Sequence, residues 1–142
     1  MTFFVDANIV IYGAVDSPYR NACFDILEAV ATGDAPGRTS TAALEEVFHA
    51  EISGKGGAIR GLASYAYSAF TPLLPVTDEI LRRALDLEAP KLGANDRVHV
   101  ATCLVNDIDL IVSADRGFDS VKGLRRVDPL DERARRRLLV AP

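Results

Sequence analysis

The chain has 142 residues, the size of one ordinary domain, and we expect a single domain that spans residues 1–142. Hydrophobic residues make up 49% of the chain and charged residues 25%, a globular composition that excludes a disordered chain. The net charge of −4 excludes a globally basic protein that coats nucleic acid. Any phosphate must therefore be bound by a local basic patch or by a metal ion.

Signals for a membrane or for secretion are missing from the sequence. The longest apolar run covers only a few residues, too short to cross a bilayer. The N-terminus has no basic start and carries Asp6 inside its apolar stretch, so a signal peptide is not expected. Cys23 and Cys103 share no metal-binding spacing and fit buried free thiols. These features predict a cytoplasmic protein that does not contact a membrane.

In the first half of the chain, short apolar segments alternate with helical patterns. Phe3–Val5 is predicted as a buried strand that ends in Asp6, and residues 9–11 extend into a turn or the start of a helix. Ser17-Pro18 is typical of a helix start, and Gly33 ends that helix. The elements predicted next are a short strand at 39–41, a helix that Gly54 ends, a flexible joint at Gly56-Gly57 and a helix over 58–70.

The second half continues the alternation. It is predicted to hold a strand at 73–76, a helix from Thr77 or Asp78 to Leu87, a helix that Asn95 or Asp96 opens, a strand at 109–113, a weak strand at 125–127 and a basic helix over 131–139. This pattern predicts an α/β fold with a mostly parallel central sheet that helices cover on both faces. Such sheets bind ligands beyond the carboxyl ends of their strands.

Two aspartates fall at the carboxyl ends of predicted strands. Asp6 directly follows the first strand, and Asp115 comes two residues after the strand that ends near Ser113. Asp96 lies at the N-terminal end of a predicted helix, where a carboxylate can also be a simple cap. Asp6 could likewise be a turn residue, so each acid is a candidate for either a structural role or a site.

The predicted helix before Gly54 carries two adjacent glutamates. Its apolar stripe, predicted as the core face, comprises Leu44, Val47, Phe48 and Ile52. Glu45 lies at the flank of this stripe, and Glu46 lies nearly opposite to it. Glu46 is thus either a solvated residue or a side chain that projects into a cleft with Asp6 and Asp96. The spacing does not decide between these two interpretations.

The chemistry of a real acidic cluster restricts its ligand. Carboxylates only a few ångströms apart repel each other, and some of their pKa values rise unless a cation compensates. Oxygen ligands select hard cations, Mg²⁺ or Mn²⁺, which suit phosphate chemistry. The two histidines, His49 and His99, are interpreted as structural or surface residues.

Four segments resemble, in order, the motifs of PIN-domain nucleases. They are Phe4–Ile9, Thr39–Val47, Asn95–Ala101 and Leu110–Asp119. In the last segment Ser113 stands two residues before Asp115, where the family usually has Thr or Ser. The resemblance runs from residue 3 to about residue 130, and the size is similar to that of the VapC-type toxins of prokaryotic toxin–antitoxin pairs.

This resemblance implies a three-layer α/β/α fold and a Mg²⁺-dependent endoribonuclease that hydrolyses RNA phosphodiester bonds, with Mn²⁺ as the other candidate ion. It implies the toxin of a type II toxin–antitoxin pair, with RNA as substrate, an antitoxin protein as partner and a homodimer. The apolar helices around 42–70 are a candidate interface that composition alone does not establish. The implied acidic site consists of Asp6, Glu46, Asp96 and Asp115. The metal ligands in it would be Asp6, Asp96 and Asp115.

Further residues are assigned around this implied site. Asn8 and Ser113 would orient the carboxylates, and Asp119 would add to the cluster. A register shift of one residue would exchange Glu46 for Glu45. The arginines allow two interpretations, phosphate or partner contacts on the one hand and charge balance or a solvated helix end on the other: Arg97, Arg116, Arg133, Arg135, Arg136 and Arg137.

A receiver-like phosphoacceptor domain and a non-catalytic binding module are the alternatives. A receiver also places aspartates at strand ends, but it needs an acidic pair after the first strand, where this chain has Asp6-Ala7-Asn8. An Asp-x-Asp phosphatase is excluded because Asn8 replaces the second aspartate. In a non-catalytic module the acids would be caps and surface residues.

Overall fold

A four-stranded parallel sheet lies at the centre of the computed structural model, which describes residues 1–54, 57 and 59–140. The strands are β1 (Phe3–Val5), β2 (Gly37–Arg38), β3 (Leu110–Val112) and β4 (Arg125–Val127), in the order β2-β1-β3-β4. All residues of β1 and β3 are buried, as expected for inner strands of a sheet covered on both faces. The predicted mostly parallel α/β architecture is confirmed.

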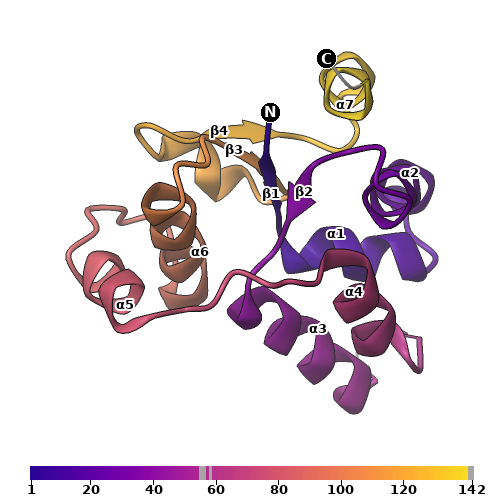
Figure 1. Ribbon diagram of the computed structural model, residues 1–142, viewed down its shortest axis with the longest axis horizontal. Coiled ribbons are helices and arrows are strands. Elements are labelled where there is room, and N and C mark those ends of the chain that lie inside the picture. The colour runs from indigo at the N-terminus through magenta and orange to yellow at the C-terminus, as the bar shows by residue number, and fades with distance from the viewer. Residues whose placement is uncertain (55–56, 58, 141–142) are drawn as a thin grey trace.

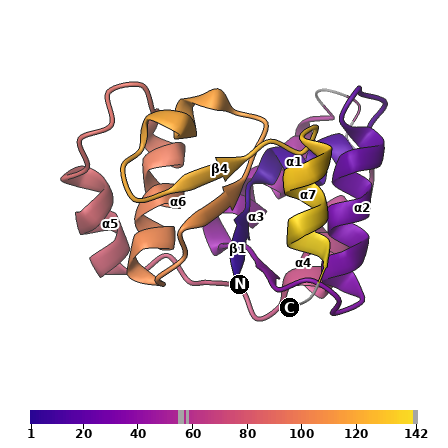
Figure 2. The same cartoon turned by 90° about the horizontal axis from the view of Figure 1, so that it is seen from above.

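Helices form the outer layers. They are α1 (Ala7–Ala14), α2 (Arg20–Ala31), α3 (Thr41–Ser53), α4 (Leu62–Phe70), α5 (Asp78–Leu85), α6 (Ala94–Val105) and α7 (Glu132–Leu139), with a 3₁₀ helix η2 at Arg116–Ser120. In Figures 1 and 2, α5 and α6 lie on one side of the sheet, and α2 and α7 lie on the other. Helix α3 packs against α1, α4 and α6.

Polar side chains fix where several helices begin. Ser40 Oγ accepts the amide proton of Ala43 at the start of α3, and Asp131 Oδ1 accepts that of Ala134 at the start of α7. Gly54 ends α3 in the left-handed conformation with φ of 65°, which glycine adopts without a steric penalty. These local signals make the predicted bounds of α3 and α7 accurate.

The strand predicted at 73–76 is not present. Only Leu74 pairs, through its amide to the carbonyl of Thr39 at 2.9 Å and through its carbonyl to the amide of Thr41 at 3.0 Å. On one side Pro72 lacks the amide proton that the ladder would need. On the other side Thr41 already begins α3, and the Val76 amide donates to Thr41 Oγ1 at 3.1 Å instead of to a strand carbonyl. The predicted strand at 39–41 is likewise replaced, because β2 lies at Gly37–Arg38 and Thr41 already belongs to α3.

Three predicted helix starts differ from the structure. Helix α2 begins at Arg20, because Ser17 and Pro18 form a turn closed by the Arg20 amide on the Ser17 carbonyl at 3.2 Å. Helix α6 begins one residue early, at Ala94, and α4 begins at Leu62. Residues 56 and 58, part of the predicted joint and helix start, lie outside the described residues.

The predicted core face of α3 is wrong in part. Val47 is buried, but Phe48 and Ile52 are 52% and 73% exposed, and Ala43 is buried instead. Small Ala43 lies on the side of α3 that approaches its neighbours, and this turns the larger apolar residues outward. The same rotation places Glu46 at the flank of the buried face rather than opposite to it.

The cysteines and the helices also bear on two expectations from the sequence. Cys23 and Cys103 are both free and buried, as predicted. Within the described part of the chain, no helix combines the length and apolar character that a membrane span needs.

Candidate active site

Asp6 occupies the carboxyl end of β1, and its residue is only 4% exposed. Its amide donates to the carbonyl of Val112 on β3 at 3.1 Å, which ties the ends of the two inner strands together. Its Oδ2 accepts hydrogen bonds from Ser113 Oγ at 2.6 Å and from Asn8 Nδ2 at 3.2 Å. A buried carboxylate is tolerated only with such partners.

Ser113 and Asn8 join this strand end to the segment that carries Asp115. Asn8 Nδ2 donates to Ser113 Oγ at 3.2 Å, and the amide of Asp115 donates to the same oxygen at 3.0 Å. The Ala114 amide reaches Asn8 Oδ1 at 3.4 Å. Ser113 and Asn8 thus lie where the sequence predicts residues that orient the carboxylates.

Glu46 of α3 reaches the same place through His99 of α6. His99 Nε2 lies 3.0 Å from Glu46 Oε1 and 3.8 Å from Asp6 Oδ1, and the histidine is fully buried. Because an ionised carboxylate only accepts, the imidazole donates its Nε2 proton to Glu46. One ligand atom from each of Asp6, Glu46 and His99 lies within 4.8 Å of the others. Glu45, by contrast, is exposed.

The interpretation of His99 as a structural or surface residue missed its place among the acids. His99 follows Asp96 by three residues, so both lie on one face of α6. That spacing is the signal that could have indicated it. His49, the other histidine, is exposed on α3.

Asp96 lies in the first turn of α6 and is half-buried. Burial is the main cause that raises its pKa from 3.8 to about 6, and neighbouring carboxylates add to the rise. Those carboxylates are Asp6, Asp115 and Glu46. Asp96 therefore lies within electrostatic reach of the other three predicted acids.

Asp115 is exposed at the start of η2. Its Oδ1 accepts the amide proton of Gly117 at 2.8 Å, so this oxygen caps η2. Within the described ranges, no hydrogen bond to its Oδ2 is present. Asp119 has a different place: its carboxylate pairs with Arg126 of β4 rather than with the other acids.

Burial dominates the electrostatics of the site. It raises the pKa of Asp6 above 3.8, although His99 and the Ser113 hydrogen bond oppose the rise. Burial alone would lower the pKa of His99, but the hydrogen bond to Glu46 and the charges of Asp6 and Glu46 outweigh it, so that pKa is raised. The Asp6 shift thus comes mainly from desolvation, whereas the His99 shift comes from the neighbouring carboxylates.

A hard divalent cation fits this donor set. The acids offer carboxylate oxygens, and their mutual repulsion is what such an ion would relieve. His99 Nε2 is directed at Glu46, so it orients a carboxylate rather than offering a free lone pair on that nitrogen. A cavity of about 460 Å³ lies along α3, and its lining includes Glu45, Glu46 and Asn95 but not Asp6, Asp96 or Asp115.

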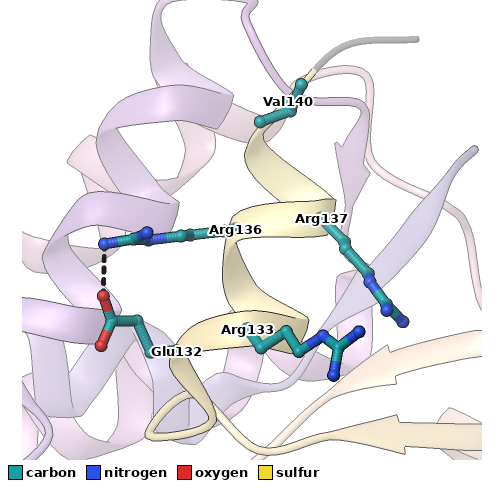
Figure 3. Close-up of a pocket in the computed structure, with 5 residues that line it drawn as sticks. All are labelled: Glu132, Arg133, Arg136, Arg137 and Val140. Atoms are coloured by element: carbon teal, nitrogen blue, oxygen red, sulfur yellow. Dashed lines mark ion pairs between the residues drawn. The ribbon is translucent and has the colours of Figure 1, made fainter.

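The arginine-rich helix α7 carries exposed positive charge, in contrast to the partly buried carboxylates of the acidic site. Figure 3 shows Arg133 and Arg137 on one side of the helix, with Arg136 on the other, where it pairs with Glu132. Arg135 instead donates to the carbonyl of Pro129 at 2.8 Å. Across the residues that the structure covers, Arg133 and Arg137 have no acidic partner. They form the charged face of α7.

A family model described as PIN domain matches residues 3–124. The chain belongs to the PIN domain family. Two similar proteins are VapC ribonuclease Mb1869c of Mycobacterium bovis and Ribonuclease VapC13 of Mycobacterium tuberculosis. Each is 31% identical over 135 residues, which cover 87% of this chain and 97% of the relative. The four sequence motifs thus identified the family correctly.

Solved structures with the same fold include toxin–antitoxin complexes. VapBC2 from Rickettsia felis, bound to a DNA fragment from its promoter, has a TM-score of 0.65 at 15% identity. That match covers 90% of this chain and 100% of the other. A toxin–antitoxin complex from Klebsiella pneumoniae has a TM-score of 0.62 at 20% identity, covering 89% and 96%. At these identities the likeness concerns the fold.

Proposed function

We propose that this PIN-domain protein is a Mg²⁺-dependent endoribonuclease, with Mn²⁺ as an alternative ion. The observation that supports the proposal is that the charges of Asp6, Glu46 and Asp115 all act on Asp96, in a chain whose relatives are named ribonucleases. Oxygen donors in excess of local positive charge suit a hard cation and, through it, a phosphodiester.

Asp6, Asp96 and Asp115 would hold the ion. When bound, Mg²⁺ would neutralise the carboxylates, polarise the phosphate oxygens and activate water for hydrolysis. Ser113 and Asn8 orient Asp6, because both donate to its Oδ2. His99 orients Glu46 by donating to its Oε1, which leaves Oε2 to accept a proton from the attacking water.

The proposed biological role is the toxin of a type II toxin–antitoxin pair. It is supported by the VapC names of the relatives and by the toxin–antitoxin complexes that share the fold. The partner would be a cognate antitoxin protein, and a homodimer stays a prediction. Residues 1–142 are proposed as a single nuclease domain.

The test compares wild-type protein with Asp6→Asn on RNA, in Mg²⁺ with and without excess EDTA. We expect cleavage that needs both Mg²⁺ and Asp6, with products that carry a 5′ phosphate. A parallel incubation with acetyl phosphate examines the receiver alternative. Stable aspartyl phosphorylation without RNA cleavage would contradict the nuclease proposal, as would cleavage that EDTA and the substitution leave unchanged.

A further inference from the structure

The side chain of Arg126 on β4 donates four hydrogen bonds, which reach Asp119, Ser113 and Asp128. Its Nε and Nη2 donate to the two carboxylate oxygens of Asp119 at 2.8 Å and 3.2 Å. Its Nη1 donates to the carbonyl of Ser113 at 2.9 Å and to Asp128 Oδ2 at 3.3 Å. The side chain is only 9% exposed, and a two-pronged guanidinium–carboxylate contact of this kind fixes both partners in orientation.

The contacts of Arg126 enclose the segment that carries Asp115. Ser113, at the start of this segment, is held through its backbone carbonyl, and Asp119, in η2, is held through its side chain. Between them, the Asp115 amide donates to Ser113 Oγ at 3.0 Å, and Asp115 Oδ1 caps η2 through the Gly117 amide at 2.8 Å. One guanidinium therefore bridges both ends of the turn on which Asp115 sits.

The same guanidinium also acts on the Asp6 side of the site. Ser113 is the residue whose hydroxyl donates to Asp6 Oδ2 at 2.6 Å, and its carbonyl is the group that Arg126 holds. Ser113 is fully buried, whereas Asp115 is exposed, and exposed carboxylates on turns are mobile unless their backbone is held. Arg126 supplies that restraint from a neighbouring strand.

We propose that Arg126 is a positioning residue: with Asp119 as its counter-ion, it holds the Ser113–Asp119 turn so that Asp115 completes the metal-binding carboxylate cluster. This inference rests on the proposed function. It assigns Asp119 to the support of the site rather than to the ligand set, and it gives Arg126 a role that its exposed neighbour Arg125 does not have.

The test measures Mn²⁺ binding to the whole protein by electron paramagnetic resonance, RNA cleavage, and the melting temperature without metal. Variants are Asp119→Asn, Arg126→Lys and the double variant, with Arg125→Gln as matched control on the same strand. Each single variant is expected to weaken Mn²⁺ binding and to lower kcat by about tenfold or more, the usual effect of losing a group that orients a metal ligand. KM for RNA should change little, and the melting temperature should fall by no more than about 4 °C.

The double variant is expected to be no worse than the more severe single variant, because both substitutions remove the same contact. The proposal is overturned if both single variants match Arg125→Gln in Mn²⁺ affinity and kcat, or if each affinity loss simply parallels a large loss of stability. Wild-type protein that binds Mn²⁺ but cleaves no RNA would instead refute the nuclease function, while an Arg126 effect on Mn²⁺ affinity would still support this inference. Wild-type protein that binds no Mn²⁺ would overturn both.

Discussion

The acidic site and the charged face of α7 show two ways in which one chain carries concentrated charge. In the site, Asp6 and Ser113 are separated by 107 residues along the chain yet hydrogen-bonded at 2.6 Å, and Asp6 and Asp96 lie in partly desolvated surroundings. On α7 the like charges of Arg133 and Arg137 are four residues apart and exposed. Buried charge needs specific partners, whereas water and salt screen exposed charge. Substitutions should therefore have large effects in the first region and small ones in the second.

The largest effect is expected for Asp6→Asn. The substitution removes a central carboxylate, so cleavage should fall by about 10²–10³-fold or more, the scale seen when one stabilising group at a reacting centre is lost. Folding should survive, because burial already disfavours the charged form of Asp6. Single-turnover cleavage and circular dichroism provide the measurements. A variant that is folded and fully active would contradict the role of Asp6.

The adjacent glutamates provide an internal control. Glu46→Gln should lower kcat by about 10²-fold or more, because the carboxylate that His99 orients is lost. Glu45→Gln should stay within about twofold of wild type, since the Glu45 side chain is exposed and His99 pairs with Glu46 instead. Both variants are assayed on the same RNA at saturating Mg²⁺. Equal losses, or the reverse order, would contradict the assignment of Glu46 to the site.

The third prediction concerns pH. Because the pKa of Asp96 is raised to about 6, the affinity for Mg²⁺ should increase as pH rises from 5 to 7, when this carboxyl group ionises. The folded protein binds the Asp96 proton more tightly than the unfolded chain does, so the metal-free stability contributed by this group falls as pH rises from the ordinary value of 3.8 to about 6.

Calorimetric titration with Mg²⁺ and thermal unfolding without metal, both at several pH values, test these two opposite trends. Asp96→Asn serves as the control, because it removes this titrating group and should reduce the slope of both profiles in this window, while Asp6 and His99, whose pKa values are also raised, still contribute. A metal affinity that is unchanged between pH 5 and 7 in the wild-type protein would contradict the prediction.

The smallest effect is expected on the charged face of α7. Replacing Arg133 and Arg137 with Gln should leave kcat unchanged and raise KM for RNA by a few-fold at low salt, with a loss that disappears as salt increases. Arg136→Gln is the control, since Arg136 already pairs with Glu132. Binding measured from 50 to 500 mM salt decides the matter. If RNA affinity does not change at low salt, Arg133 and Arg137 do not contact RNA, and the other interpretation, a solvated helix end, holds.

Local sequence patterns were enough to predict the fold class and the family of this protein. The alternation of short apolar segments with helical patterns predicted the parallel sheet, and the order of four motifs identified the family. These features depend on residues that are close in sequence and on the rule that parallel strands end at a common edge, so the sequence alone predicts them.

Tertiary packing decided the rest. Hydrophobic spacing alone predicted that α3 buries Phe48 and Ile52. In the structure the helix buries Ala43 instead, and Glu46 rather than Glu45 contacts His99. The same holds for Arg126 and Asp119, whose contact depends on how η2 lies against β4. Such contacts depend on how separate elements pack against one another, and no spacing within a single segment encodes that rotation.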